Sequence, residues 1–257
     1  MVDDVRTSLP SMPIPVRQSA PEFGLTGKSP LAVAQEQIVT CERCRRLREY
    51  CQRIATIKKA AHRDDVYWGR PVPGFGDPLA RVLILGLAPA AHGANRTGRV
   101  FTGDGGGGSG DFLMRALHEN GFASAPVSQR PDDGLTLTDA FIAATVRCAP
   151  PDNKPSPGEV LACRVHLDAE WDALPRVQIV VTLGRISFDA CWARLARRGV
   201  PVRPRPPFAH CAEYEVGGGP LVIGSYHPSR QNTNTGRLTA TMMHDVFALA
   251  AARLRRS

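Results

Sequence analysis

Short runs of apolar residues alternate along this chain with longer segments of mixed polarity. The short runs lie at 82–85, 141–146, 178–183 and 221–224, and the first is closed by Gly86. A strand that is apolar at nearly every position is covered on both faces, as in a buried parallel sheet. The segments 111–120, 160–171, 186–198 and 238–254 carry apolar residues at helical spacing. The alternation of the two kinds predicts a parallel sheet in a three-layer α/β/α sandwich.

The chain before the first strand is less regular. Residues 1–28 are rich in Pro and Ser and poor in large apolar side chains, so we expect a flexible tail. Residues 29–50 have a helical pattern, and the prolines and glycines of 64–80 predict an irregular approach to the first strand. We therefore expect one domain, residues 29–257, after the tail.

The stretch 88–110 follows the first strand but does not have the composition of a strand. It contains Pro89, which cannot donate to a ladder, and many glycines, which let backbone approach a ligand closely. Ligands of open α/β sheets bind beyond the carboxyl ends of the strands, so this stretch is a candidate binding site. The glycines at 105–108 match no phosphate-binding motif, because no Gly-Lys-Ser/Thr follows them.

Three residues near strand ends have both an ordinary and a functional interpretation. Phe101 packs a core or forms the flat wall of a base pocket. Asn153 forms a turn or offers a donor and an acceptor to the edge of a base. His227 packs or caps, or it stabilises negative charge that develops on a leaving group. The position of His227 favours its functional interpretation, because it follows a strand at the same sheet edge as residues 88–110.

Four cysteines are spaced as metal ligands. Cys41 and Cys44 form a Cys-x-x-Cys pair, and Cys148 and Cys163 flank a loop that leads into a helix. The helix start is marked by Ser156 and Glu159, which have capping-box spacing. Four thiolates suit either structural zinc or a four-iron cluster, and spacing does not decide between them. The remaining cysteines stand outside this set: Cys51, Cys191 and Cys211.

Charge and hydropathy narrow the function classes. The chain has 32 Lys and Arg against 24 Asp and Glu, a net charge of +8. This balance favours an acidic partner such as nucleic acid, although a basic protein without such a partner has the same composition. No apolar run approaches the roughly 18 residues of a membrane span, and Asp3, Asp4 and several prolines interrupt any signal-peptide core. We expect a cytoplasmic protein with reduced thiols and no membrane contact.

Taken together, the motifs resemble a known family. Over most of residues 38–250 the chain is similar to the family-five (type b) uracil-DNA glycosylases. The similarity lies in the four spaced cysteines and in three segments, GLAPAAHGANRTGRVFTGD, RCAPPDNKPSP and SYHPSRQNTNTGRLT. The resemblance implies an α/β/α fold with a central four-stranded parallel sheet and a [4Fe–4S] cluster on the cysteines. It implies monofunctional excision of uracil, and in the family also of hypoxanthine and xanthine, from double- and single-stranded DNA in base excision repair. We expect a monomer acting at the bacterial nucleoid.

The same resemblance suggests roles for single residues. Phe101 would stack on the extruded uracil, Asn153 would read its Watson–Crick edge, and His227 would face uracil O2. Ala88 stands where related families keep a polar, water-activating residue, which leaves Asn95 as the candidate to orient the water. Gly86 and His92 are also expected to contact the substrate. The residues expected to contact DNA are Arg230, Gln231, Asn232 and Asn234.

One departure and two alternatives remain open. The segment GDGGGGSGD is longer in glycines than the family form, so Asp104 and Ser109 receive no role. A non-catalytic DNA-binding module with zinc on the cysteines would explain the charge and the thiols, but not a Phe, an Asn and a His at one sheet edge. A small-molecule nucleotide hydrolase would act on free nucleosides and would be insensitive to salt.

Overall fold

The computed structural model describes residues 27–102 and 108–256. Most of the expected tail, and the glycine run with Asp104, therefore lie outside the described residues. One mixed sheet has the strand order β1-β3-β2-β4-β6-β5. Its four inner strands are parallel, as predicted, and the two short edge strands run antiparallel to their neighbours. The strands are β1 (Phe75–Gly76), β2 (Val82–Gly86), β3 (Ala140–Ala144), β4 (Ile179–Leu183), β5 (Glu213–Tyr214) and β6 (Leu221–Ser225).

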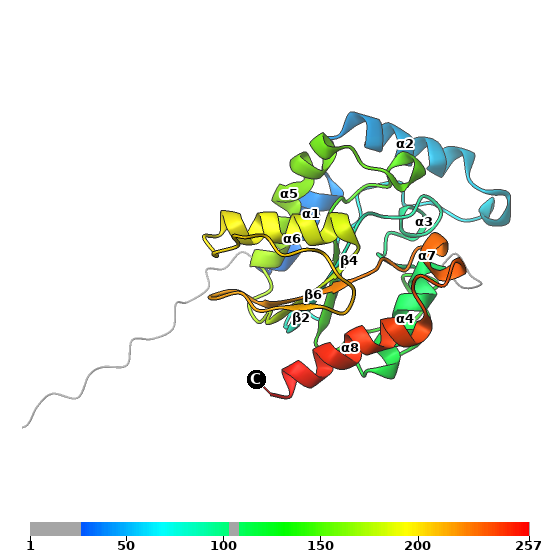
Figure 1. Cartoon of the computed structure of the whole chain (residues 1–257). Helices are drawn as coiled ribbons and strands as arrows, with labels where there is room; N and C mark the ends of the chain where they lie inside the picture. Colours follow the sequence, from blue (N-terminus) through cyan, green and yellow to red (C-terminus); the bar gives the residue numbers. More distant parts are fainter. Residues whose placement is uncertain (1–26, 103–107, 257) are drawn as a thin grey trace, which may run out of the picture.

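Helices cover both faces of this sheet, which confirms the three-layer sandwich (Figure 1). One face carries α1 (Pro30–Val39), α5 (Pro157–Asp172) and α6 (Arg185–Arg197). The other face carries α4 (Ser109–Glu119) and α8 (Ala240–Leu254). All residues of β2, β3 and β4 are buried, because helices remove both faces from water.

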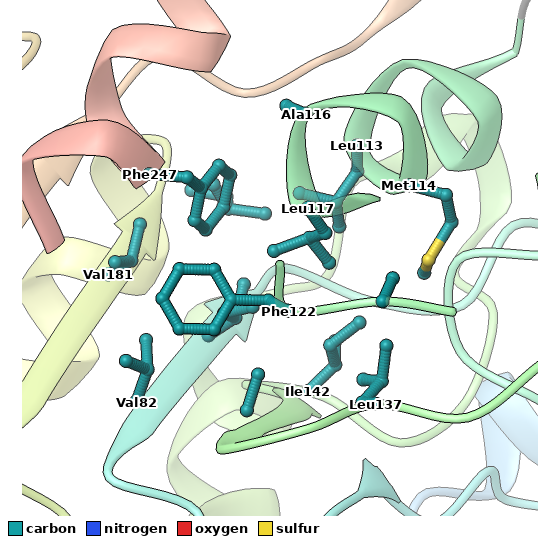
Figure 2. Packing of buried hydrophobic residues seen from close by; sticks show 14 of the residues in the cluster. Val82, Leu113, Met114, Ala116, Leu117, Phe122, Leu137, Ile142, Val181 and Phe247 are labelled. Carbon is teal, nitrogen blue, oxygen red and sulfur yellow. The ribbon is translucent and has the colours of Figure 1, made fainter. Parts of the chain in front are cut away.

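The two cores use alternate residues of the same strands. Val82 and Ile84 face α4 and α8, whereas Leu83 and Leu85 face α1, α5 and α6. Figure 2 shows the first core, in which Phe122 lies between the helices and the sheet. Its ring meets that of Phe247 from α8 edge-on, with centroids 6.4 Å apart.

Short elements occupy the connections around the sheet. They are α2 (Arg45–Ile57), α3 (Ala94–Thr97), α7 (Arg230–Asn234) and two 3₁₀ turns, η1 (Ala60–His62) and η2 (Pro151–Asn153). The α3, η2 and α7 segments follow β2, β3 and β6, so they lie at the carboxyl edge of the sheet. The helix α2 contacts α3.

One local prediction is corrected by the structure. The segment 29–50 is not one helix, because α1 ends at Val39 and α2 begins at Arg45. The Cys-x-x-Cys pair therefore lies in the turn between the two helices, where Cys44 has a non-helical ψ of 86°. Residues 230–234 form the short helix α7, which is capped by Ser229, whose hydroxyl accepts from the Asn232 N–H.

The start of α5 matches its prediction in detail. The Ser156 hydroxyl accepts from the Glu159 N–H at 3.2 Å, and the Glu159 carboxylate accepts from the Ser156 N–H at 2.7 Å. This capping box satisfies donors that the first turn of a helix leaves free. It thereby fixes where the η2 loop ends and α5 begins.

Candidate active site

The end of β2 makes room for an aromatic ring. A Cβ atom added at Gly86 would lie 2.7 Å from Cε2 of Phe101. That is closer than real Cβ contacts, so only glycine lets this ring lie against the strand end. Phe101 itself is partly exposed, so one part of the ring remains open to a ligand.

The backbone around Phe101 is held in an unusual conformation. Phe101 has a φ of 52°, in the left-handed region that few non-glycine residues adopt. Next to it, the buried Thr102 hydroxyl donates to the Arg99 carbonyl at 2.6 Å and accepts from the Thr97 hydroxyl at 2.9 Å. Arg99 in turn forms an ion pair with Asp133 at 2.5 Å. Such strain persists only where neighbouring contacts enforce it, and it is common at binding sites.

His227 lies opposite Phe101, just beyond the end of β6. The ring centroids are 6.1 Å apart and the planes are inclined by 32°. Behind the histidine is Gly184, which has a φ of 91° and whose added Cβ would lie 3.2 Å from Cβ of His227. The His227 carbonyl accepts from the Ser229 N–H and from the Asn232 side-chain amide, both at 2.8 Å. Two distant segments are thus brought together across the sheet edge.

The charge state of His227 follows from its surroundings. Burial lowers the pKa of His227 to about 4, because a cationic ring is poorly solvated there. At neutral pH the imidazole is therefore uncharged and carries one N–H donor.

Asn153 stands at the same edge, after β3, in the η2 turn. Asp152 and Asn153 have φ values of 54° and 56°, so two successive residues are left-handed. The Asn153 side chain is exposed, and its backbone N–H donates to the Pro150 carbonyl at 3.2 Å. The Asn153 side chain therefore lies on the surface at the sheet edge, and its predicted contact with a base edge stays a prediction.

The loop after β2 holds the other three predicted residues in different surroundings. Ala88 packs against a buried group that includes Cys51 and Cys148. Nδ1 of His92 lies 3.0 Å from the Tyr67 hydroxyl. Asn95 is fully buried, and its amide donates to the carbonyls of Cys51, at 3.3 Å, and Ala91, at 3.4 Å. Oδ1 of the same amide is buried and has no hydrogen-bond partner among the described residues. The water-orienting role expected for Asn95 stays a prediction.

The predicted DNA-contacting residues divide into two groups. Arg230, Gln231 and Asn234 are exposed on α7. Asn232 is half-buried, and its amide is engaged by the His227 carbonyl. Asn232 therefore positions the histidine and is not free to reach a nucleotide in this arrangement.

A support behind this loop was not found by sequence reasoning. Nδ1 of His210 accepts from the Tyr226 N–H at 3.1 Å, and the two rings stack with centroids 4.9 Å apart. The Arg237 guanidinium lies over Tyr226, 4.9 Å from the ring centroid. No local motif surrounds His210, so only the fold reveals its contact with the residue before His227.

All four predicted cysteine ligands line one cavity. They come from the α1–α2 turn, the end of β3 and the first turns of α5: Cys41, Cys44, Cys148 and Cys163. The Arg147 N–H donates to Sγ of Cys163 at 3.3 Å. Burial raises the pKa of Cys163 to about 11, and a hydrogen bond with Cys51 together with burial raises the pKa of Cys148. A metal bound here has to displace protons from these thiols.

The arrangement of these thiols limits what they can hold. Among the residues that the structure describes, no three His, Cys, Asp or Glu side chains are close enough to bind a single metal ion. The four thiols nevertheless line a common space together with His166, whose Nε2 is buried and has no hydrogen-bond partner among the described residues.

A buried ion pair braces the wall of this cavity. Nη1 of Arg147 lies 2.6 Å from Oε2 of Glu170, and both side chains are almost fully buried. The Glu170 carboxylate also accepts from the Gly74 N–H at 2.7 Å, and the Arg147 carbonyl accepts from the Val72 N–H at 2.7 Å. The pair ties the segment after β3 and the helix α5 to the loop before β1.

Comparison with known proteins identifies the family. The uracil DNA glycosylase superfamily model matches residues 73–251. The chain belongs to the uracil DNA glycosylase superfamily. The matched region contains Gly86, Phe101, Asn153 and His227, whereas Cys41 and Cys44 precede it.

Individual relatives agree with this assignment. The chain is 48% identical to the type-5 uracil-DNA glycosylase of Mycobacterium tuberculosis over 211 residues, which are 82% of this chain and 76% of the relative. It is 47% identical to that of Thermus thermophilus, over 82% of this chain and 93% of the relative. The type-4 uracil-DNA glycosylase of Sulfurisphaera tokodaii is 29% identical, over 62% and 64% of the two chains.

None of the described helices is both long enough and apolar enough to cross a membrane.

Proposed function

We propose that this protein excises uracil from DNA by hydrolysing the N-glycosidic bond, as the first step of base excision repair. The observation that carries the proposal is the Phe101–His227 pair at the carboxyl edge of the sheet, with ring centroids 6.1 Å apart. The names of the type-5 relatives support the same reaction. Residues 29–257 form the catalytic domain, which acts as a monomer on cytoplasmic, nucleoid-associated DNA.

The extruded base occupies the space at the end of β2. A glycosylase cannot reach the glycosidic bond inside the duplex, so the nucleotide first flips out of the stack. The uracil ring then stacks on Phe101, while Gly86 leaves the space that this arrangement needs. The exposed amide of Asn153 offers one donor and one acceptor to the pyrimidine edge. His92, on the loop after β2, contributes to the wall of the same site.

His227 stabilises the leaving group. When the C1′–N1 bond breaks, its electron pair passes to uracil N1 and the negative charge spreads to O2. The neutral imidazole donates its N–H to O2 at that moment, and a donor already aimed at the developing charge lowers the barrier. The two hydrogen bonds to the His227 carbonyl keep the ring from turning away.

Water completes the reaction at the sugar. It adds to C1′, which has become cation-like, and then loses a proton to solvent. Ala88 supplies no base at the position where related families keep a polar residue, so leaving-group stabilisation carries more of the catalysis than proton abstraction. Asn95 is the candidate to orient this water.

The DNA backbone is held mainly by charge. The chain carries a net charge of +8, and Arg230, Gln231 and Asn234 are exposed on α7 beside the histidine. This segment enters the space that the flipped base leaves behind. Both double- and single-stranded DNA are substrates, because the recognition is of one extruded nucleotide.

A His227→Ala variant tests the proposal. Loss of one such donor costs roughly 100-fold or more in rate, so uracil excision from a double-stranded oligonucleotide should fall by at least that factor while DNA binding stays nearly unchanged. His244→Ala, on α8, is the matched control and should excise normally. Near wild-type excision by the His227 variant would refute the mechanism. The same assay with hypoxanthine, xanthine and T mispairs defines the range of bases.

We also propose that Cys41, Cys44, Cys148 and Cys163 hold a [4Fe–4S] cluster. A cluster gives one thiolate to each of four irons, so it holds the sulfurs farther apart than a single zinc ion does. Four cysteine thiols that line one cavity supply the number of ligands that such a cluster needs. When bound, the cluster supplies a cross-link between the α1–α2 turn, β3 and α5, next to the loop that carries Ala88.

Iron content tests the cofactor. Purified wild-type protein should be brown and contain iron and inorganic sulfide, and Cys148→Ser should be colourless or insoluble. Cys211→Ser, outside the cavity, should keep the colour. A fully coloured and active Cys148→Ser variant would contradict the assignment, and zinc without iron would instead favour the DNA-binding-module alternative.

A further inference from the structure

His166 is a buried imidazole inside the cysteine cavity. It lies on α5, three residues after Cys163, and only 6% of the residue is exposed. Residues at i and i+3 share one face of a helix, so both side chains point toward the same space. His166 lines the cavity together with all four predicted ligands.

The ring has an unsatisfied nitrogen. Nε2 of His166 has no hydrogen-bond partner among the described residues, although it is fully buried. Buried polar atoms almost always have a partner, and an exception indicates a group that the protein is built to meet. The unpartnered atom is a potential donor on the wall of a space that thiols surround.

Two arginines on the cavity wall are held by ion pairs. The Arg147 N–H donates to Cys163, and the Arg147 guanidinium is paired with Glu170. Arg48 is paired with Glu42 and donates to the Gly69 carbonyl. The side-chain nitrogens of Arg147 also form no hydrogen bond among the described residues, so Arg147 and His166 both hold buried donors here. Of the two, only His166 is not already held by an ion pair.

We propose that Nε2–H of His166 donates a hydrogen bond to a sulfur of the bound cluster and thereby sets its reduction potential. The inference rests on the proposed cofactor. Hydrogen bonds to the sulfurs are one of the means by which proteins tune such clusters. A donor stabilises the reduced form most, because that form carries more negative charge on sulfur, so His166 raises the potential.

The donor needs no charge of its own. A neutral imidazole has one N–H, and placing it on Nε2 gives the cluster a hydrogen bond without a second buried charge.

Two variants of the iron-loaded protein test the proposal. His166→Leu removes the donor and should lower the midpoint potential measured by voltammetry, whereas His166→Gln keeps an N–H and should recover most of the wild-type value. His244→Leu is the control and should not change the potential. An unchanged potential in a fully loaded His166→Leu variant would overturn the inference.

If the His166→Leu variant does not bind the cluster, spectroscopy of the wild-type protein tests the same hydrogen bond. With ¹⁵N-labelled histidine, pulsed electron paramagnetic resonance of the reduced cluster should show a nitrogen coupled through the hydrogen bond. Absence of that coupling counts against the proposal. Wild-type protein without iron would overturn the cofactor and this inference together. Iron-loaded protein with normal uracil excision but no dependence on residue 166 would overturn this inference alone.

Discussion

Glycine and left-handed residues shape the pocket at the scale of single residues. Gly86 and Gly184 stand directly behind Phe101 and His227 and have no side chains to displace them. Phe101 and Asn153 both have positive φ values, which cost of order 1–3 kcal/mol each. Two of the three residues expected to touch the base thus carry backbone strain.

Gly86→Ala tests this steric argument. The new methyl group would lie 2.7 Å from the Phe101 ring, so the ring must move and kcat/KM for uracil excision should fall at least tenfold, about 1.4 kcal/mol in transition-state binding. Gly217→Ala is a matched control, because nothing lies within 4 Å of the added atom and activity should be unchanged. Equal activity of both variants would show that Phe101 need not lie against β2.

The lowered pKa of His227 predicts an unusual pH dependence. The ratio of wild-type to His227→Gln excision rates should stay constant between pH 8 and 5.5, because the imidazole is already neutral there. A ratio that changes with a midpoint near 6.5 would indicate an ordinary exposed histidine.

The free energy of unfolding, unlike the rate ratio, should depend on pH through His227. Between pH 6.5 and about 4 the unfolded chain binds a proton at residue 227 and the folded chain does not, so the free energy of unfolding falls as the pH drops through this window. Urea titrations should show a weaker acid dependence in His227→Gln. An identical slope in both proteins would contradict the lowered pKa.

At the scale of secondary-structure elements, the cysteine cavity and the catalytic loop share a wall. Ala88 and Ala91 pack against the group that contains Leu47, Cys51 and Cys148. The segment after β3 carries Cys148 and then, in the η2 turn, Asn153. A cluster that fastens β3 to α2 and α5 would therefore also hold the base-binding loops in place.

Arg147→Met tests the brace behind this wall. Removing one partner of a buried ion pair leaves the other charge uncompensated, so the free energy of unfolding should fall by about 3–5 kcal/mol. Arg185→Met, which breaks an exposed pair with Asp189, should change it by less than about 1 kcal/mol. Similar losses in urea denaturation of the two variants would mean that the pair around Glu170 has no special role.

At the scale of the whole molecule, charge governs the encounter with DNA. A net charge of +8 predicts that binding weakens as salt rises, since each phosphate contact releases a counterion. A nucleotide hydrolase acting on free nucleosides would lack this dependence.

Arg230→Ala should lower the slope of log Kd against log salt by about one unit, the value expected for one lost phosphate contact. Arg203→Ala is the control: it changes an exposed arginine beyond the far end of α6, and its slope should match the wild type. Fluorescence anisotropy with a uracil-containing duplex measures both. An Arg230 variant with an unchanged slope would place the DNA elsewhere.

Local pattern alone predicted much of this protein. Four apolar runs determined the parallel strands, and the Ser156–Glu159 pair determined the start of α5, because burial on both faces and helix capping are recorded in neighbouring residues. The order of the elements also placed Phe101, Asn153 and His227 at the carboxyl edge. The motifs shared with relatives indicated the chemistry expected there.

Tertiary packing decided how the side chains are used. Asn95 and Asn232 are both polar residues in functional motifs, yet one amide is directed at α2 and the other at the His227 carbonyl. His210 belongs to no motif, and its partner Tyr226 lies in another segment of the chain. His166 belongs to no motif either, and only the fold places it in one cavity with cysteines from three segments. Hydrogen bonds and desolvation depend on distances that form only when the chain folds, so no local pattern contains them.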